Sequence, residues 1–357
     1  MTGAPVVVVT GIAAAPMAAA TIALQWDLPN AVVVQHRIDV VEQRLHRVVS
    51  DVTGTLDHTV IELQHACVSC AIREDVVPTL HHLTEDGRWD TVIAHLPVGA
   101  EATQVCRVSA HEGRAGVRIA NVVAALEGET LIEDLLGDDL LCERGLHSCD
   151  EDERGVGEVG TAIIEYADHI ALSGTALDQG AALVSALARP GVPVVGDTSG
   201  LDVRALLAQM RRHQAAESWV AEVRRAPGRP AAHDDVWTVD LHSALPLHPE
   251  RLLEAIELIG GGPRRSRGCF WLSSRPGEIC GWQGAGGQLS VGSVGSWGLS
   301  KPVTRITVTG LDDDADDIRQ AFQRCLLTER EADSRGTRWT VTQDGFEPWL
   351  GPITRVA

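Results

Sequence analysis

The sequence predicts an α/β protein in which a parallel sheet with helices on both faces is followed by a smaller α+β domain. Residues 6–9 are four consecutive valines, a run that is typical of a strand covered on both faces. Apolar strand patterns alternate with helical patterns up to residue 223, as expected when helices connect the strands of a parallel sheet. Beyond residue 223 the helical patterns thin out and strand patterns dominate. Together these observations predict the fold class.

The expected elements follow from the same patterns. In the first domain we expect strands at 6–9, 31–34, 59–63, 91–96, 117–125, 169–172 and 192–195, and helices at 72–83, 154–167, 179–188 and 201–223. Asp202 is expected to cap the last of these helices. In the second domain we expect strands at 236–241, 268–272, 278–282, 288–291 and 304–310, and helices at 249–259 and 315–326. The acidic run at 312–317 is expected to mark a helix start, where the helix dipole stabilises carboxylates.

A basic, proline-rich stretch at 224–230 is the best candidate for a linker, because proline and glycine interrupt regular elements. We therefore expect a first domain at 1–223, a linker at 224–235 and a second domain at 236–357.

The composition excludes several classes of function. The 357-residue chain has a net charge of −19, so its overall field does not attract nucleic-acid phosphates. Lys301 is the only lysine, which excludes a phosphate-binding lysine in the first 300 residues. No basic segment of a secretory signal precedes residue 6, and we expect 6–24 to be a buried strand and helix rather than a membrane span. Eight cysteines without such a signal indicate reduced thiols in the cytoplasm.

The turn after the valine run has the position of a phosphate-binding loop, Gly-x-x-x-x-Gly-Lys-Ser/Thr. Such a loop holds phosphates with amides and a lysine, and Mg²⁺ with a hydroxyl. Gly11 fits the first glycine, but Pro16 lacks an N–H, Met17 replaces the lysine and Ala18 replaces the hydroxyl. We expect a degenerate loop, comprising Gly11, Ala14, Met17 and Ala18, that does not hydrolyse nucleotides. A weak nucleotide contact without Mg²⁺ stays open.

Cys67 and Cys70 form a C-x-x-C pair between an apolar strand and a helix. Two thiolates at this spacing can bind one tetrahedral ion, and zinc suits such ligands. A helix that begins at Cys70 would also lower the thiol pKa. Further metal ligands would come from Glu62 and His65 nearby, or from His36. A redox pair and two core cysteines are the alternatives.

The other cysteines carry less information. Cys142 and Cys149 flank His147 in an acidic segment whose spacing matches no standard metal site, and we interpret these thiols as incidental. Three more cysteines are expected in the core: Cys269, Cys280 and Cys325.

These motifs resemble the CobW family of P-loop metal-handling GTPases. In that family a Walker loop is followed by a Gly-Cys-x-Cys-Cys metal motif, with which residues 66–70 align, Ser69 replacing the middle cysteine. Arg73 and Asp75 match the residues that follow. Further similar segments lie at 152–154, 165–170, 247–252, 267–276 and 325–328. The resemblance implies a P-loop G-domain-like fold for the first domain and a CobW C-terminal domain for the second.

Apart from Ser69, the departures from the family pattern concern the nucleotide. Met17 stands at the lysine, and residues 95–99 lack the acidic residue of the family's Glu-x-x-Gly segment. Ser173 and Ala176 replace the asparagine and aspartate that read guanine in that family. The resemblance therefore implies zinc as the bound ion, and GTP and Mg²⁺ are not expected as cofactors.

This degenerate pattern is similar to the actinobacterial branch that recruits a ribosome hibernation factor under zinc limitation. The resemblance implies a zinc-responsive interaction protein whose partners are the hibernation factor and the ribosome, with neither a membrane nor sequence-specific DNA. Arginines at 224, 225 and 229, and at 264, 265 and 267, either contact RNA or solvate a linker and a loop. The alternatives are a GTP-dependent zinc metallochaperone and a redox-active C-x-x-C protein.

Overall fold

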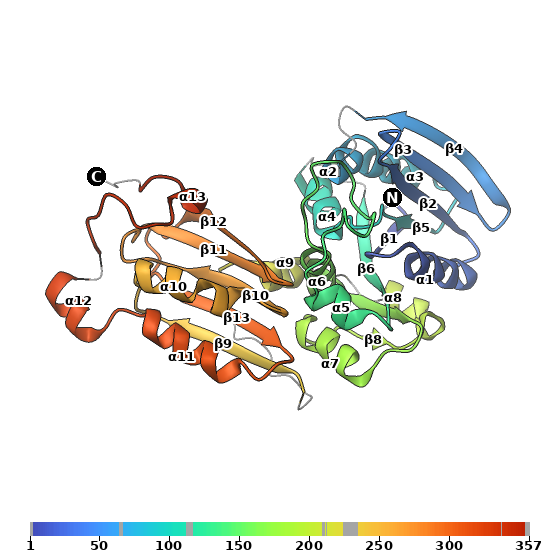
Figure 1. Ribbon diagram of the computed structural model, residues 1–357. Helices are drawn as coiled ribbons and strands as arrows, with labels where there is room; N and C mark the ends of the chain where they lie inside the picture. The colour runs from blue at the N-terminus through green and yellow to red at the C-terminus, as the bar shows by residue number, and fades with distance from the viewer. Residues whose placement is uncertain are drawn as a thin grey trace. The chain divides into compact units, whose positions relative to one another are not determined.

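The computed structural model describes residues 3–63, 67–111, 117–208, 211, 213–223, 235–336 and 338–353. They form two compact units, shown in Figure 1. The first unit comprises Met1–Asp134 and Asp139–Trp219, and the second comprises Leu135–Asp138 and Val220–Ala357. Most of the predicted linker lies outside the described residues. None of the described helices is long and apolar enough to span a lipid bilayer.

The first unit is built on an eight-stranded sheet in the order β4-β3-β2-β5-β1-β6-β7-β8. Strands β2, β5, β1, β6, β7 and β8 are parallel to their neighbours, which confirms the predicted parallel sheet. Strands β3 and β4 add an antiparallel ribbon at one edge. The bounds are β1 (Pro5–Thr10), β2 (Ala31–Asp39), β3 (Arg44–Asp51), β4 (Gly54–Glu62), β5 (Thr91–His95), β6 (Arg118–Glu127), β7 (His169–Ser173) and β8 (Val194–Val195).

Helices cover both faces of this sheet, as predicted. Val7 and Val9 of β1 belong to a core cluster with residues of α1 and α8, whereas α3 and α4 contact β1 and α6 contacts β6. All four valines are fully buried, because successive residues of a strand face opposite sides and both sides are covered. The helices are α1 (Ala14–Asp27), α2 (Val68–Ala71), α3 (Val77–Asp86), α4 (Ala102–His111), α5 (Leu131–Leu136), α6 (Val156–Tyr166), α7 (Asp178–Leu187), α8 (Val203–Ala208) and α9 (His213–Val220).

The predicted single helix at 201–223 is wrong. The described residues of this range form two helices, α8 and α9, and Asp202 caps the first of them by accepting a hydrogen bond from the Ala205 N–H at 3.0 Å. The apolar spacing continues across both helices, and it cannot reveal a break between them.

The antiparallel ribbon β2-β3-β4 projects from the sheet and was only partly predicted. The first residues of β2 are buried, whereas β4 is the edge strand and most of its residues are exposed. A small core cluster of Leu45, Leu63 and Ala71, with Ile38 and Ile61 packed against it, joins the inner face of the ribbon to α2. This cluster places the ribbon beside the cysteine pair.

The second unit is an antiparallel sheet in the order β12-β11-β10-β13-β9, with α10 and α11 packed on one face (Figure 1). Its core is formed by residues such as Phe270, Trp282 and Phe322. Helix α11 begins at Ala315 with acidic residues in its first turn, as predicted. The bounds are β9 (Trp237–Ser243), α10 (Pro249–Gly260), β10 (Arg264–Phe270), β11 (Glu278–Ala285), β12 (Gln288–Ser296), β13 (Thr304–Gly310), α11 (Ala315–Cys325), α12 (Glu329–Arg335) and α13 (Glu347–Leu350).

One predicted arginine cluster does not lie on the surface. Arg264, Arg265 and Arg267 belong to β10 and are only 5%, 5% and 8% exposed. The guanidinium of Arg264 pairs with the carboxylates of Asp312 and Asp314. The suggested RNA contact through this cluster is therefore wrong. The other arginines, at 224, 225 and 229, lie outside the described residues.

A buried ion pair holds the last part of the second unit. The Arg275 and Asp344 side chains are 1% and 0% exposed, and their closest oxygen and nitrogen atoms are 2.9 Å apart. Arg275 also donates to the carbonyl oxygens of Leu350 and Gly351. We expect Asp344→Ala to lower the free energy of unfolding by about 3–5 kcal/mol, because a buried guanidinium then loses its counter-ion. Urea unfolding followed by tryptophan fluorescence measures this change.

The matched control is Asp316→Ala, which removes an exposed partner of Arg319. Exposed pairs contribute little, so this variant should change the unfolding free energy by less than about 1 kcal/mol. If both variants lost the same free energy of unfolding, the buried Arg275–Asp344 pair would contribute no more to stability than an exposed pair does.

Candidate functional site

The turn after β1 lacks the lysine and hydroxyl side chains that bind phosphate and Mg²⁺ in a P-loop. Helix α1 begins at Ala14, so the residues expected to cradle phosphate form its first turn. The Met17 side chain is fully buried in the core beside Val7 and Val9. A Cβ atom on Gly11 would lie 2.9 Å from Met17 Cγ, which shows how closely the thioether fills this place. The degenerate loop thus has an apolar side chain where a lysine would carry its charge, while Ala14 and Ala18 are exposed.

The segment after β5 closes on the same turn. The Gly99 N–H donates to the Gly11 carbonyl oxygen at 2.9 Å. His95, at the end of β5, is buried with its Nδ1 atom 2.9 Å from Thr21 Oγ1. Burial, together with the nearby His36, lowers the pKa of His95 to about 4, so the imidazole is neutral at pH 7. An uncharged ring stands at the start of the segment that lacks the family's acidic residue.

The segment expected to read guanine is also tightly packed. The Ser173 carbonyl oxygen, at the end of β7, accepts a hydrogen bond from the Gly128 N–H at 2.6 Å. Gly174 has a positive φ of 72°, and a Cβ atom there would lie 2.7 Å from the Glu127 carboxylate. Ser173 and Ala176 offer neither an amide nor a carboxylate side chain. Whether a nucleotide binds this unit stays a prediction.

The cysteine pair lies at the start of α2. Cys67 precedes the helix, and its Sγ atom accepts a hydrogen bond from the Cys70 N–H at 3.4 Å. Both side chains are partly exposed. The predicted lowering of the thiol pKa is wrong: the helix begins at Val68, and the hydrogen bond with Cys67 and burial raise the pKa of Cys70.

The other ligands suggested for this pair are placed elsewhere. Glu62 is exposed, and its carboxylate lies 3.8 Å from the Arg44 guanidinium. His36 is buried against Asp75, and His65 lies outside the described residues. In the described residues, Cys67 and Cys70 belong to no group of three potential ligands within 4.8 Å of one another. The cysteine pair as a zinc site therefore stays a prediction.

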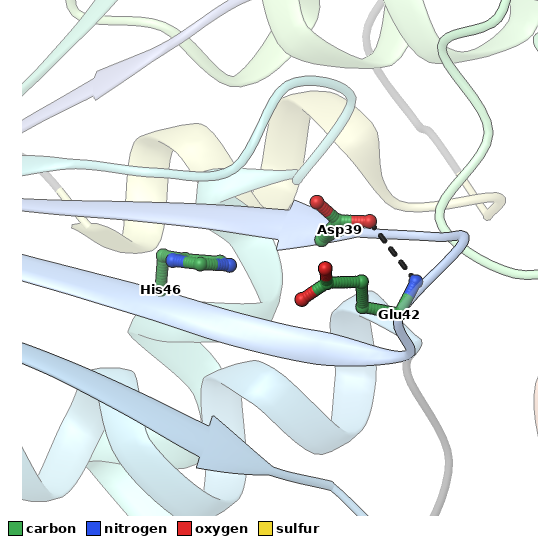
Figure 2. A group of neighbouring side chains, drawn as sticks. All are labelled: Asp39, Glu42 and His46. Atoms are coloured by element: carbon green, nitrogen blue, oxygen red, sulfur yellow. Dashed lines mark hydrogen bonds between the residues drawn. The ribbon is translucent and has the colours of Figure 1, made fainter.

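A different set of metal ligands meets at the β2–β3 hairpin. Asp39 ends β2, Glu42 lies in the turn and His46 lies on β3; one ligand atom from each falls within 4.8 Å of the others. Figure 2 shows the imidazole directed toward the two carboxylates. Asp39 pairs with Arg44 and Arg37 pairs with His46 in the strand register, which puts Asp39 and His46 on one face of the ribbon.

Asp39 and His46 have properties that suit metal binding. The Glu42 N–H donates to Asp39 at 3.0 Å, and this hydrogen bond, with the charges of Arg37 and His46, lowers the pKa of Asp39. The Nε2 atom of His46 is buried without a hydrogen-bond partner among the described residues. Carboxylate oxygens and imidazole nitrogens are common zinc ligands.

The sequence analysis missed this cluster because it depends on strand pairing. The spacing of the three residues matches no standard motif, and the predicted strand at 31–34 ended before Asp39. The alternating pattern of 44–50, read as a second strand after a short turn, would have placed Asp39 and His46 together.

The remaining predicted cysteines are placed as follows. Cys142 is exposed and Cys149 is partly exposed, and burial raises the pKa of Cys149. The three cysteines expected in the core are buried, as predicted: Cys269, Cys280 and Cys325.

Comparison with known protein families identifies a domain in the second unit. Residues 236–326 match the cobalamin synthesis protein cobW C-terminal domain. This match identifies residues 236–326 as a CobW C-terminal domain. The architecture of the first unit agrees with the P-loop fold expected for a CobW protein, since central β1 leads through a short turn into α1 between parallel neighbours. The assignment to the hibernation-factor branch of CobW proteins stays a prediction.

Several relatives are similar to most of this chain. The protein named zinc chaperone Rv0106 of Mycobacterium tuberculosis is 28% identical over 343 residues, which cover 89% of this chain and 79% of the relative. Zinc-regulated GTPase metalloprotein activator 1 of Dictyostelium discoideum is 21% identical over 258 residues, covering 67% and 54%. The zinc-bound YjiA GTPase of E. coli is similar in structure, with 17% identity, a TM-score of 0.38, and coverage of 92% of this chain and 100% of YjiA.

The buried His95 makes stability depend on pH. In the folded protein its pKa is about 4, whereas an unfolded histidine takes up a proton below its ordinary pKa of 6.5. The contribution of this group is therefore lost as the pH falls from 6.5 to 4, by about 3 kcal/mol in total. We expect His95→Asn to flatten the dependence of unfolding free energy on pH in this window.

Urea unfolding at several pH values measures the slope. The exposed His82 supplies the control, since His82→Asn should leave the slope as it is in the wild type. A His95→Asn protein with an unchanged slope would show that His95 is not the responsible group.

Proposed function

We propose that this protein is a zinc chaperone that takes up zinc at the β2–β3 hairpin. The observation that carries the proposal is the convergence of Asp39, Glu42 and His46. It is supported by the relative named zinc chaperone Rv0106 and by the relative named as a zinc-regulated metalloprotein activator.

Three ligands from the hairpin would leave one position of a tetrahedral zinc ion open. Sites that keep an open position exchange or activate a fourth ligand, whereas closed four-ligand sites are structural. Glu42 is exposed and Asp39 is partly exposed, so zinc can enter from solvent and a client's ligand can reach it. Arg44 lies 3.3 Å from the Glu42 carboxylate and competes with zinc for it, which favours release.

Cys67 and Cys70 form the second zinc-binding group of the proposed function. Thiolates are softer ligands than carboxylates, and zinc accepts both kinds. A hairpin with oxygen and nitrogen ligands would acquire zinc, and the two thiolates would hold it more firmly.

The proposed chaperone works without a triphosphate on the turn after β1. The buried Met17 and the early start of α1 support this part of the proposal. It differs in this respect from a GTP-dependent zinc metallochaperone, which needs a charged and open phosphate loop.

Recruitment of a hibernation factor to the ribosome stays a prediction, and no described feature favours it over zinc transfer. A pull-down from cells grown with and without zinc, scored for ribosomal proteins and for metalloenzymes, would decide between them.

Removing two hairpin ligands should weaken zinc binding. We expect the Asp39→Asn, His46→Ala variant to lose at least roughly 10–100-fold in affinity at this site, since losing even an outer-shell partner costs that much. Competition with a chromogenic chelator, with metal content measured by mass spectrometry, gives the affinity and the stoichiometry.

The control variant is Asp51→Asn, His82→Ala, which changes the same residue types outside the cluster, at a partly exposed aspartate and an exposed histidine. It should bind zinc as the wild type does. If the hairpin variant also keeps the wild-type affinity and stoichiometry, zinc binds elsewhere and the proposal fails.

Calorimetry with GTP and Mg²⁺ tests whether the proposed chaperone works without a bound nucleotide. We expect no saturable heat and no turnover, because a thioether cannot neutralise phosphate charge and the first helical turn occupies the loop. Micromolar affinity with measurable hydrolysis would favour the GTP-dependent metallochaperone instead.

A further inference from the structure

We propose that Asp75 is a positioning residue that couples zinc binding at the hairpin to zinc binding at the cysteine pair. This inference rests on the proposed function, because it requires both groups to bind zinc. Asp75 contacts neither group directly, and its role follows from what its carboxylate joins.

The Asp75 carboxylate is buried and holds both strands of the hairpin. Arg47 Nη1 on β3 lies 2.6 Å and 3.2 Å from its two oxygens, and His36 Nε2 on β2 lies 3.2 Å from Oδ2. Thr79 Oγ1 donates to the same carboxylate at 3.3 Å and receives a hydrogen bond from Arg47. His36 and Arg47 are direct partners in the strand register, so one carboxylate fixes a cross-strand pair.

His46 lies between two anchors to the cysteine segment. Its neighbour Arg47 is held by Asp75, and its other neighbour, Leu45, belongs to a buried cluster with Ala71. Ala71 directly follows Cys70 in α2. Successive strand residues face opposite sides, so both neighbours of His46 face the cysteine segment while the His46 ring faces the opposite side. A movement of α2 would therefore reach β3 on both sides of His46 through these contacts.

A π-helical turn lies between the cysteine pair and α3 and includes Asp75. Residues Ile72–Val76 form a π-helical turn between α2 and α3. Such turns hold one residue more than an α-helical turn and occur frequently at functional sites. When zinc orders Cys67 and Cys70, a shift of this turn toward α-helical geometry would carry the Asp75 carboxylate, and with it Arg47 and His36. A bistable element that both sites bias is the physical requirement for coupling.

The negative charge of Asp75 maintains its contacts with His36 and Arg47 at neutral pH. Burial by itself would raise the pKa of Asp75, but the hydrogen bond from His36 and the charges of His36 and Arg47 outweigh it and lower the pKa. The carboxylate is therefore ionised and retains both partners.

The experiment measures coupling at the cysteine pair. Co²⁺ replaces zinc in the full-length protein, and its thiolate charge-transfer band reports on bound cysteine. The part of the band that disappears in Cys67→Ser, Cys70→Ser belongs to this pair, since Cys142 and Cys149 are also accessible. The Co²⁺ affinity of the cysteine pair is measured first in the wild type and in the Asp39→Asn, His46→Ala variant. Both measurements are then repeated in proteins that also carry Asp75→Asn. We expect removal of the hairpin ligands to change the affinity about fivefold or more with Asp75 present, and less than about twofold with Asp75→Asn.

Asp57→Asn is the matched control. Asp57 also pairs with Arg47, at 3.5 Å, but it lies on the edge strand β4 and has no link to the cysteine segment. The fivefold effect should persist in this variant. Thr79→Val, which removes only the hydroxyl that bridges Asp75 and Arg47, should give an intermediate effect and serves if Asp75→Asn does not fold.

Two results would overturn the inference: a wild-type affinity that does not depend on the hairpin ligands, or an effect of the same size with Asp75→Asn. A wild-type protein without a thiolate band would overturn it as well. That last result would leave chelator-measured zinc binding at the hairpin standing, so failure of the coupling and failure of the proposed function are distinguishable.

Discussion

The contact between the Asp75 carboxylate and the His36–Arg47 pair determines how the first unit presents its metal ligands. The antiparallel ribbon has little core of its own, and its edge strand is largely exposed. An isolated two- or three-stranded ribbon is marginally stable unless it packs on another element. Its attachment to the segment after the cysteine pair, through one buried ionic cluster and one small apolar cluster, gives the hairpin a fixed position. The geometry of Asp39, Glu42 and His46 depends on that attachment.

The zinc chemistry proposed for the unit has two parts that differ in ligand type. The hairpin offers oxygen and nitrogen atoms near solvent, and the cysteine pair offers sulfur atoms at the start of a helix. Zinc is a borderline ion that accepts all three donor atoms. The two ligand sets lie on opposite sides of the ribbon, and Asp75 and the Leu45–Ala71 cluster connect the segments that carry them.

The sequence predicted the parts of the fold whose signals are local. The valine run and the alternation of strands with helices need no knowledge of tertiary partners, and both were predicted, although the break between α8 and α9 was not. The hairpin cluster depends on the register between β2 and β3, which no single segment encodes. The three arginines of β10 suggested a surface patch because isolated guanidinium groups are seldom buried. Their burial requires acceptors such as Asp312 and Asp314, which lie far along the chain.

The buried thioether of Met17 has a consequence for the history of such a site. Lysine at this position would be a charge in an apolar core, next to valines and a glycine with no space beside it, before any phosphate was available to pair with it. Met17→Lys by itself would therefore destabilise the domain. The packing around residue 17 thus selects against lysine independently of what the domain binds.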